Sequence, residues 1–98
     1  MSFWRKSVYE LEFHEKVVDD IQYFPKEVRS SVFNAIKERL SLKPYNFNPL
    51  KGKKFRGLYR LRVADYRIVY TIDEKRQTVR ILAIGHRSKI YKFLSRRI

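Results

Sequence analysis

The segment Gly57–Tyr70 constrains the fold most strongly, because apolar and charged residues alternate along it. It reads GLYRLRVADYRIVY. Residues i and i+2 of a strand share a face, so Arg60 and Arg62 point to the same side. The other side receives only apolar or aromatic residues, namely Tyr59, Leu61 and Val63. The pattern predicts a strand with one core face and one arginine face.

A two-residue hairpin turn at 64–65 brings a third arginine onto the same face. With this turn, Arg62 lies opposite Arg67, and Tyr59 lies opposite Tyr70 on the core face. Like charges directly opposite each other on a sheet are destabilising. The arginine face is therefore expected to bind an anion, and phosphate is the candidate that best matches the guanidinium group.

The basic charge is concentrated in the second half of the chain. Residues 1–50 contain 8 Lys and Arg against 7 Asp and Glu, a net charge of +1, whereas residues 51–98 contain 15 against 3, a net charge of +12. The sequence pI is about 10.3. This imbalance is typical of a protein that binds nucleic acid, and it also suits an acidic protein partner.

Length and composition exclude several classes of site. The 98 residues predict one domain over 1–98. Without cysteine there is no disulfide, no thiolate metal site and no cysteine nucleophile. His14 and His86 do not make a metal site by themselves, so neither a metal nor a cofactor is expected. No long uncharged apolar run is present, and the start MSFWRKSVYE lacks the apolar core of a signal peptide, so we expect a soluble cytoplasmic protein without membrane contact.

The spacing of apolar residues predicts the order of elements. Alternation over 8–13 predicts a first strand, and helical spacing predicts a helix from residue 15 to Pro25 and a second helix from Pro25 to Pro44. Residues 44–56 form a basic loop, and a third strand of the meander covers 78–84. Residues 88–97 predict a short helix that docks weakly or frays. The prediction is an α+β domain of order β-α-α-β-β-β, with an antiparallel sheet, a helical hairpin packed on one face, and a short C-terminal helix or tail.

The register of the third strand depends on the turn before it. A four-residue loop at 73–76 places Arg67 opposite Leu82. The strand residues that then share the arginine face are Arg80, Leu82, Ile84 and His86. A slip of one residue reverses this assignment.

Together these features resemble the RelE/ParE toxin superfamily, specifically the RelE-like messenger-RNA endonucleases of bacterial and archaeal toxin–antitoxin systems. The resemblance rests on the order of elements, on LKGKKFRGLYRLRVADYRIVYTID at 50–73 and on ILAIGHRSKIY at 81–91. It implies a toxin that enters the ribosomal A site and cuts messenger RNA by attack of the ribose 2′-hydroxyl on the adjacent phosphate, without metal or cofactor. It also implies a cognate RelB-like antitoxin.

The resemblance implies roles for individual residues. Arg67 matches the arginine that stabilises the phosphate, Arg87 the basic residue at the leaving oxygen, and Tyr91 the aromatic residue that stacks on or orients a nucleotide. Arg60 and Arg62 stand where related toxins place lysines, one of which is thought to help deprotonate the 2′-hydroxyl. An arginine is a poor general base because it stays protonated.

The general base is therefore expected among other residues near the motif. Lys53, Lys54 and His86 are candidates, and His86 alone titrates near neutral pH without perturbation. The expected catalytic set is Arg62, Arg67, His86, Arg87 and Tyr91. The expected substrate-binding set is Arg60, Lys51, Lys53, Lys54, Arg56 and Arg80.

Three other interpretations remain open at this point. The arginine face is a solvated surface, the chain is a ParE-like toxin that inhibits DNA gyrase without nuclease activity, or it is a nucleic-acid-binding module without catalysis. The last of these usually exposes stacking aromatics on its sheet, whereas the sheet tyrosines here are predicted to face the core. Ala64 also departs from the glycine that relatives often place in the tight turn, which leaves the turn type open.

Overall fold

The computed structural model describes residues 8–98 and confirms the α+β class. One five-stranded sheet has the order β1-β5-β4-β3-β2. Its strands are β1 (Glu10–Phe13), β2 (Asn48–Pro49), β3 (Leu58–Val63), β4 (Tyr66–Asp73) and β5 (Thr78–His86). The helical elements are α1 (Val17–Ile21), α2 (Lys26–Ala35) with its π-helical continuation η2 (Ile36–Leu40), the 3-10 turns η3 (Pro44–Asn46) and η4 (Lys53–Phe55), and α3 (Ile90–Ser95).

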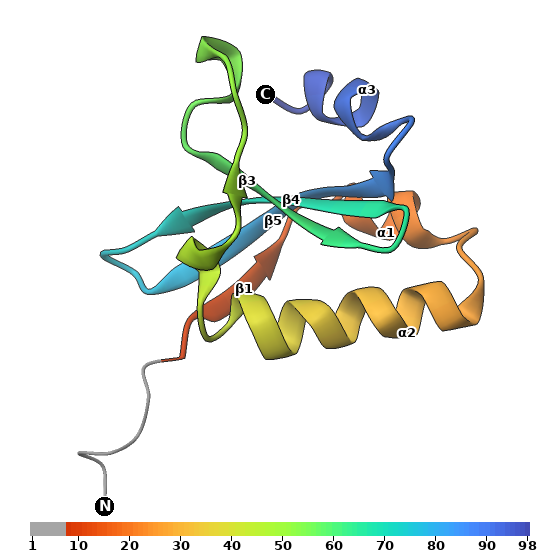
Figure 1. Ribbon diagram of the computed structural model, residues 1–98, viewed down its shortest axis with the longest axis horizontal. Coiled ribbons are helices and arrows are strands. Elements are labelled where there is room, and N and C mark those ends of the chain that lie inside the picture. The colour runs from red at the N-terminus through yellow and green to blue at the C-terminus, as the bar shows by residue number, and fades with distance from the viewer. Residues whose placement is uncertain (1–7) are drawn as a thin grey trace, which may run out of the picture.

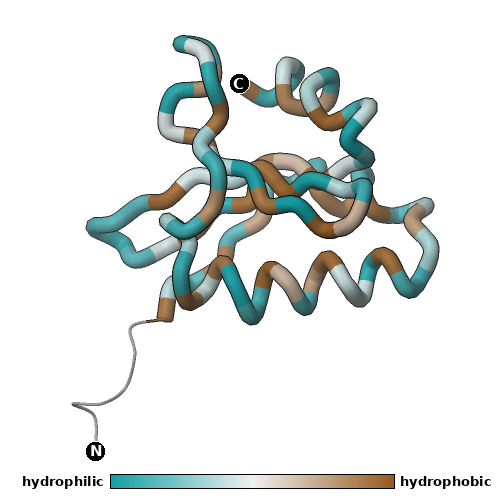
Figure 2. Tube along the Cα trace, in the orientation of Figure 1, coloured by the Kyte–Doolittle hydropathy of each residue, from teal (hydrophilic) through white to brown (hydrophobic). Residues whose placement is uncertain are grey.

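The sheet carries a helix on each side, as Figure 1 shows, with α2 below it and α3 above it. The larger core lies between α2 and the sheet, where Val32, Ile36 and Leu40 pack against Tyr70 and Ile81. Figure 2 shows the corresponding hydrophobic positions recurring along α2. The predicted helical hairpin on one face is therefore confirmed. Within residues 8–98, no helix combines the length and the apolar character that crossing a membrane requires.

A second, smaller core lies under α3. Val69 and Leu82 from the sheet pack there against Ile90 and Leu94, and both of these α3 side chains are fully buried. The expectation that the C-terminal segment docks weakly or frays is wrong. The reason is that this face of the sheet is apolar away from the arginines and gives the short helix a surface on which to bury its leucine and isoleucine.

The β3–β4 hairpin has the predicted register. Arg62 pairs with Arg67 and Tyr59 with Tyr70, so the arginine face and the tyrosine core face are both confirmed. The turn residue Ala64 adopts a φ of 54°, a region that residues other than glycine seldom occupy. Pairing across the two strands thus imposes this conformation on an alanine.

The register of β5 differs from the prediction because the turn before it lies one residue later, with Asp73 paired to Thr78, and because of a β-bulge. Val69 pairs with Ala83 but Tyr70 pairs with Ile81, so Leu82 is an extra residue on β5. A bulge shifts the alternation of faces by one residue. The turn accounts for two residues of the shift and the bulge for one, so Arg67 lies opposite Gly85 instead of Leu82. Arg80 and Leu82 keep the predicted face, but the assignment of Ile84 and His86 to the arginine face is wrong.

The edges of the sheet depart from a purely antiparallel arrangement. β1 pairs with β5 in parallel, because the two strands are separated by most of the chain and no tight turn forces them to run in opposite directions. β2 is a short strand within the segment predicted as a loop, and it pairs with β3 through Asn48 and Pro49. Its brevity and its proline explain why no strand pattern marks it.

Candidate functional site

Four arginines gather at the turn end of the β3–β4 hairpin. Arg60, Arg62 and Arg67 come from β3 and β4, and Arg87 follows directly after β5. The backbone N–H of Arg87 donates to the carbonyl of Asp65 at 2.8 Å, which ties the end of β5 to the turn. The arginine cluster, meaning Arg60, Arg62, Arg67 and Arg87, is therefore fixed by strand pairing and by this turn contact.

Arg67 lies at the centre of the cluster. Its Nη1 donates to the carbonyl oxygens of Ala64 and Tyr66 at 3.0 and 2.9 Å, so the guanidinium is held in place by the turn. Burial lowers the pKa of Arg67, repulsion from Arg62, Arg60 and Arg87 lowers it further, and Asp65 opposes the shift. The neighbouring positive charges therefore disfavour the protonated form of Arg67, an effect that a nearby anion would oppose.

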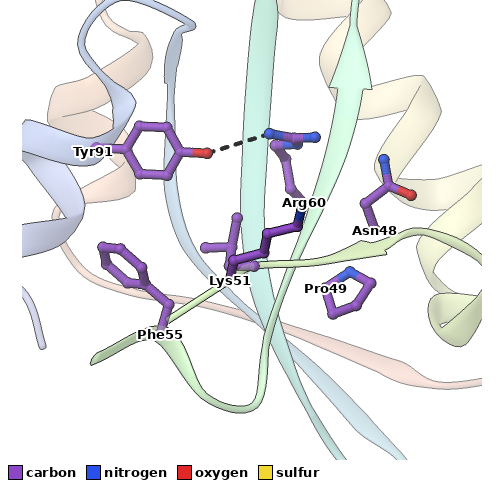
Figure 3. A pocket seen from close by; sticks show the side chains of 7 residues that line it. Asn48, Pro49, Lys51, Phe55, Arg60 and Tyr91 are labelled. Atoms are coloured by element: carbon purple, nitrogen blue, oxygen red, sulfur yellow. Dashed lines mark hydrogen bonds between the residues drawn. The ribbon is translucent and has the colours of Figure 1, made fainter. Parts of the chain in front are cut away.

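An open hollow of about 810 Å³ adjoins the cluster. Its lining consists of Asn48, Pro49, Leu50, Lys51, Phe55, Arg60 and Tyr91. In Figure 3, Tyr91 and Arg60 point toward each other across the hollow, and the Nη1 of Arg60 donates to the Tyr91 hydroxyl at 3.2 Å. The Tyr91 ring lies 5.9 Å from the Phe55 ring, centroid to centroid. The hollow thus combines cations with two aromatic rings on one wall.

Arg60 belongs to both the arginine cluster and the hollow. Its Nε is buried and has no hydrogen-bond partner among the residues that the structure describes. A buried donor without a partner is costly. An oxygen-rich ligand in the hollow would offer hydrogen-bond acceptors to the Arg60 guanidinium.

The basic loop forms the wall opposite α3, and the two stand on the same side of the sheet in Figure 1. Lys51 lines the hollow. Lys54 Nζ lies 3.4 Å from the hydroxyl of Ser95 and 6.0 Å from the centre of the Phe55 ring. Lys53 and Arg56 are exposed on the same loop and do not line the hollow.

Two of the predicted site residues lie elsewhere. Arg80 lines a separate hollow of about 480 Å³ together with acidic residues that include Glu12 and Glu74. His86 pairs with Tyr66 and places its ring edge-on to that tyrosine at 5.6 Å, on the side of the helical hairpin. Its Nδ1 accepts a hydrogen bond from the backbone N–H of Ser88 at 3.2 Å. The structure therefore separates both residues from Arg67.

The prediction missed Phe55, Asn48, Pro49 and Leu50 as parts of the hollow. Phe55 stands between Lys54 and Arg56, and an aromatic residue within a basic run is a signal typical of nucleic-acid surfaces. Asn48 and Pro49 had no such signal, because their place depends on the pairing of β2 with β3.

Chemically, the arrangement suits a phosphodiester with an adjacent base. The guanidinium groups donate to phosphate oxygens, and the rings of Tyr91 and Phe55 offer stacking surfaces. Within residues 8–98, no three His, Asp or Glu side chains are grouped so as to hold a metal ion. Arginine is a poor general base, so the cluster suits anion binding.

The sequence of this chain is similar to a known protein family and to two known toxins. The family model for the ParE toxin of the type II toxin–antitoxin system parDE matches residues 11–91. Toxin RelG of Mycobacterium tuberculosis is 27% identical over 84 residues, which cover 86% of this chain and 97% of that toxin. Toxin RelE of the same organism is 29% identical over 73 residues, covering 74% and 75% of the two chains.

Solved structures agree with the sequence comparisons. The toxin–antitoxin complex RelBE2 from Mycobacterium tuberculosis contains a chain with a TM-score of 0.77 and 27% identity, covering 86% of this chain and 97% of that one. The isolated E. coli RelE toxin has a TM-score of 0.67 at 24% identity, covering 91% and 97%. An archaeal RelE–RelB complex from Pyrococcus horikoshii gives 0.62 at 24% identity, covering 84% and 98%. The latter two show the shared fold alone.

Proposed function

The chain belongs to the RelE/ParE superfamily of type II toxin–antitoxin toxins, and on that premise we propose that it is a ribosome-dependent endoribonuclease. In this proposal it enters the ribosomal A site, cleaves messenger RNA there and so inhibits translation. Cleavage needs neither metal nor cofactor. The names of its relatives, Toxin RelG and Toxin RelE, support the RelE branch.

The observation that carries the proposal is the position of Arg67 inside a group of like charges. Repulsion from Arg62, Arg60 and Arg87 adds to the effect of burial on the pKa of Arg67. Side chains that repel each other at a fixed site destabilise the free protein and are stabilised by a multiply charged anion. A pentavalent phosphorane carries more negative charge than the ground-state diester, so such a site favours the transition state.

The proposed reaction is an internal transfer at phosphorus. The 2′-oxygen of the ribose bonds to the adjacent phosphorus, the bond to the 5′-oxygen of the next nucleotide breaks, and the products are a 2′,3′-cyclic phosphate and a free 5′-hydroxyl. Arg67 and Arg62 stabilise the equatorial oxygens. Arg87 neutralises the leaving oxygen, and Tyr91 with Phe55 holds a neighbouring base by stacking.

In this proposal, the position of each basic side chain relative to the hollow decides its role. His86 lies on the opposite face of the sheet from Arg67. Lys51 lines the hollow beside Arg60, and Lys53 and Lys54 do not. We therefore propose that Lys51 contacts the substrate phosphate in the hollow, and that Lys53, Lys54 and Arg56 attract RNA to the loop.

Regulation in this proposal comes from a cognate RelB-like antitoxin. Several structural neighbours are toxin–antitoxin complexes. A partner segment with acidic and apolar residues complements the exposed lysines of the loop and the arginine cluster. By covering the hollow it excludes messenger RNA. The ribosomal target implies a cytoplasmic protein in which residues 1–98 act as one domain.

The experiment that tests the proposal is a map of messenger-RNA 5′ ends after the chain is added to translating ribosomes. New ends within codons, absent with free messenger RNA and absent with Arg67→Ala, are expected. The competing ParE-like activity predicts no new RNA ends and, instead, DNA breaks that depend on gyrase. That result would overturn the proposed nuclease while leaving the family assignment intact.

A further inference from the structure

A buried ion pair between Asp20 and Arg97 joins α1 to the end of the C-terminal helix, and the proposed reaction does not use it. Arg97 Nη1 lies 2.7 Å from Asp20 Oδ2, and Nη2 lies 2.5 Å from Oδ1, so the contact is bidentate. The side chains of Arg97 and Asp20 are only 10% and 3% exposed. The other ion pairs within residues 8–98, such as Arg76 with Glu12, are largely exposed.

The same two side chains also bond to the backbone of β5. Asp20 Oδ2 accepts a hydrogen bond from the N–H of Ile84 at 3.0 Å, and Arg97 Nη1 donates to the carbonyl of Leu82 at 2.9 Å. The register of β1 against β5 ends at the pair of Phe13 with Ile81. Beyond that pair, the Asp20 carboxylate and the Arg97 guanidinium bond to the backbone of β5 in place of β1. Each charge is therefore both paired and hydrogen-bonded, as buried ions require.

α3 depends on contacts with the rest of the molecule. It has six residues, which is too short for a helix to be stable on its own. Ile90 and Leu94 bury their side chains, and the Phe93 ring packs so close to Gly85 that a Cβ there would lie 3.0 Å from it. These apolar contacts are non-directional, whereas the bidentate pair sets where the end of the helix lies.

The orientation of α3 in turn places Tyr91 beside Arg60. Tyr91 is the second residue of this helix, and its hydroxyl accepts the hydrogen bond from Arg60 that spans the hollow in Figure 3. We propose that Asp20 and Arg97 are positioning residues, whose ion pair holds α3 on β5 and so keeps Tyr91 at the hollow. The structural half of this inference, that the ion pair holds α3, does not depend on any enzymatic activity. The effect of the pair on cleavage rests on the proposed function.

Amide hydrogen exchange tests the structural half. With Asp20→Asn or Arg97→Gln, we expect the amides of α3 to exchange at least about tenfold faster, while those of α2 and β4 keep their rates. Arg97→Gln leaves Asp20 bonded to the N–H of Ile84, so it keeps the test available if Asp20→Asn does not fold. The matched control is Glu12→Gln, which removes the exposed pair with Arg76 and should not alter α3. Unchanged exchange in α3 with Arg97→Gln overturns the inference.

A double-mutant cycle tests whether the pair acts through Tyr91. Arg97→Gln should lower the rate of ribosome-bound cleavage about tenfold in the Tyr91 background and less than about twofold in the Tyr91→Ala background, because coupled residues are non-additive. Equal losses in both backgrounds contradict positioning through Tyr91. If the unmodified chain cleaves nothing, the proposed function fails, and the exchange rates alone decide whether the pair holds α3.

Discussion

Tyr91 offers an RNA substrate two separable contacts, its hydroxyl and its ring. The hydroxyl accepts a hydrogen bond from Arg60, and the ring lies 5.9 Å from that of Phe55. We expect Tyr91→Phe to lower kcat/KM only severalfold and Tyr91→Ala to lower it by about 10- to 100-fold, because stacking on a base is worth about 1–3 kcal/mol. Single-turnover cleavage on programmed ribosomes measures both. Equal losses for the two variants would argue against a stacking role.

His86 and Arg87 are consecutive residues, yet they serve different faces of the sheet. His86 packs edge-on to Tyr66 on the side of the helical hairpin, whereas Arg87 adds its charge to that of Arg67. We expect Arg87→Ala to reduce cleavage by at least about 100-fold, as for a residue that assists the leaving group, and His86→Ala to stay within about threefold of the unmodified rate. A large loss with His86→Ala would instead support His86 as the general base.

These single-residue assignments show how much of the site could be predicted from the sequence. Alternation along residues 57–70 predicted the common face of Arg60, Arg62 and Arg67, because strand geometry leaves no other choice once the turn is set. It could not predict the extra residue Leu82, which has no local signature and reverses the faces of Ile84 and His86. Nor could it pair Asp20 with Arg97, since these residues are 77 positions apart.

The β3–β4 hairpin is the element that the site depends on most, and its turn is strained. Ala64 has a φ of 54°, which costs an L-residue roughly 1–2 kcal/mol. Ala64→Gly should therefore raise the free energy of unfolding by about 0.5–1 kcal/mol, after the larger conformational entropy of unfolded glycine is subtracted. Chemical denaturation at neutral pH measures the change. Destabilisation by glycine here would mean that the turn differs from the one described.

The β4–β5 hairpin joins three elements through one carboxylate. Glu74 accepts hydrogen bonds from the hydroxyls of Tyr9 and Tyr45 and from the side-chain amide of Gln77, each at 2.9 Å. The bond from Gln77 contributes most to lowering the pKa of Glu74, followed by those from Tyr9 and Tyr45. The same carboxylate raises the pKa of Tyr45 to about 12.

This depressed pKa predicts a pH dependence of stability. A carboxyl group whose pKa is lower in the folded protein stabilises it above the unfolded pKa, and the contribution disappears as pH falls through the folded value. The ordinary value is 4.5, so the contribution of Glu74 should be complete at pH 7 and lost below pH 4.5. The difference in thermal midpoint between the unmodified chain and Glu74→Gln should accordingly shrink on acidification. A difference that grows toward low pH has the wrong sign.

At the scale of the whole molecule, the two halves of the chain differ in charge and form different parts of the structure. The first half, with a net charge of +1, supplies the edge strand β1 and the helical hairpin, which covers one face of the sheet. The second half, with a net charge of +12, supplies the arginine cluster and α3 on the other face. The spacing of apolar residues predicted this division, because it is mainly helical in the first half and mainly alternating in the second. The short β2, the parallel pairing of β1 and the firm docking of α3 depend on contacts distant in sequence, which local patterns do not encode.

The most direct test compares two arginines of the same sheet that differ in place. Arg67 lies within the cluster, whereas Arg80 lines the separate hollow that also contains Glu12 and Glu74. Arg67→Ala and Arg80→Ala each remove one positive charge. Single-turnover cleavage of messenger RNA on ribosomes, with the product ends identified, should fall at least about 100-fold for Arg67→Ala. For Arg80→Ala it should stay within about threefold, with 2′,3′-cyclic phosphate ends retained. Equal losses for the two variants would contradict a phosphate site built by the geometry of the cluster.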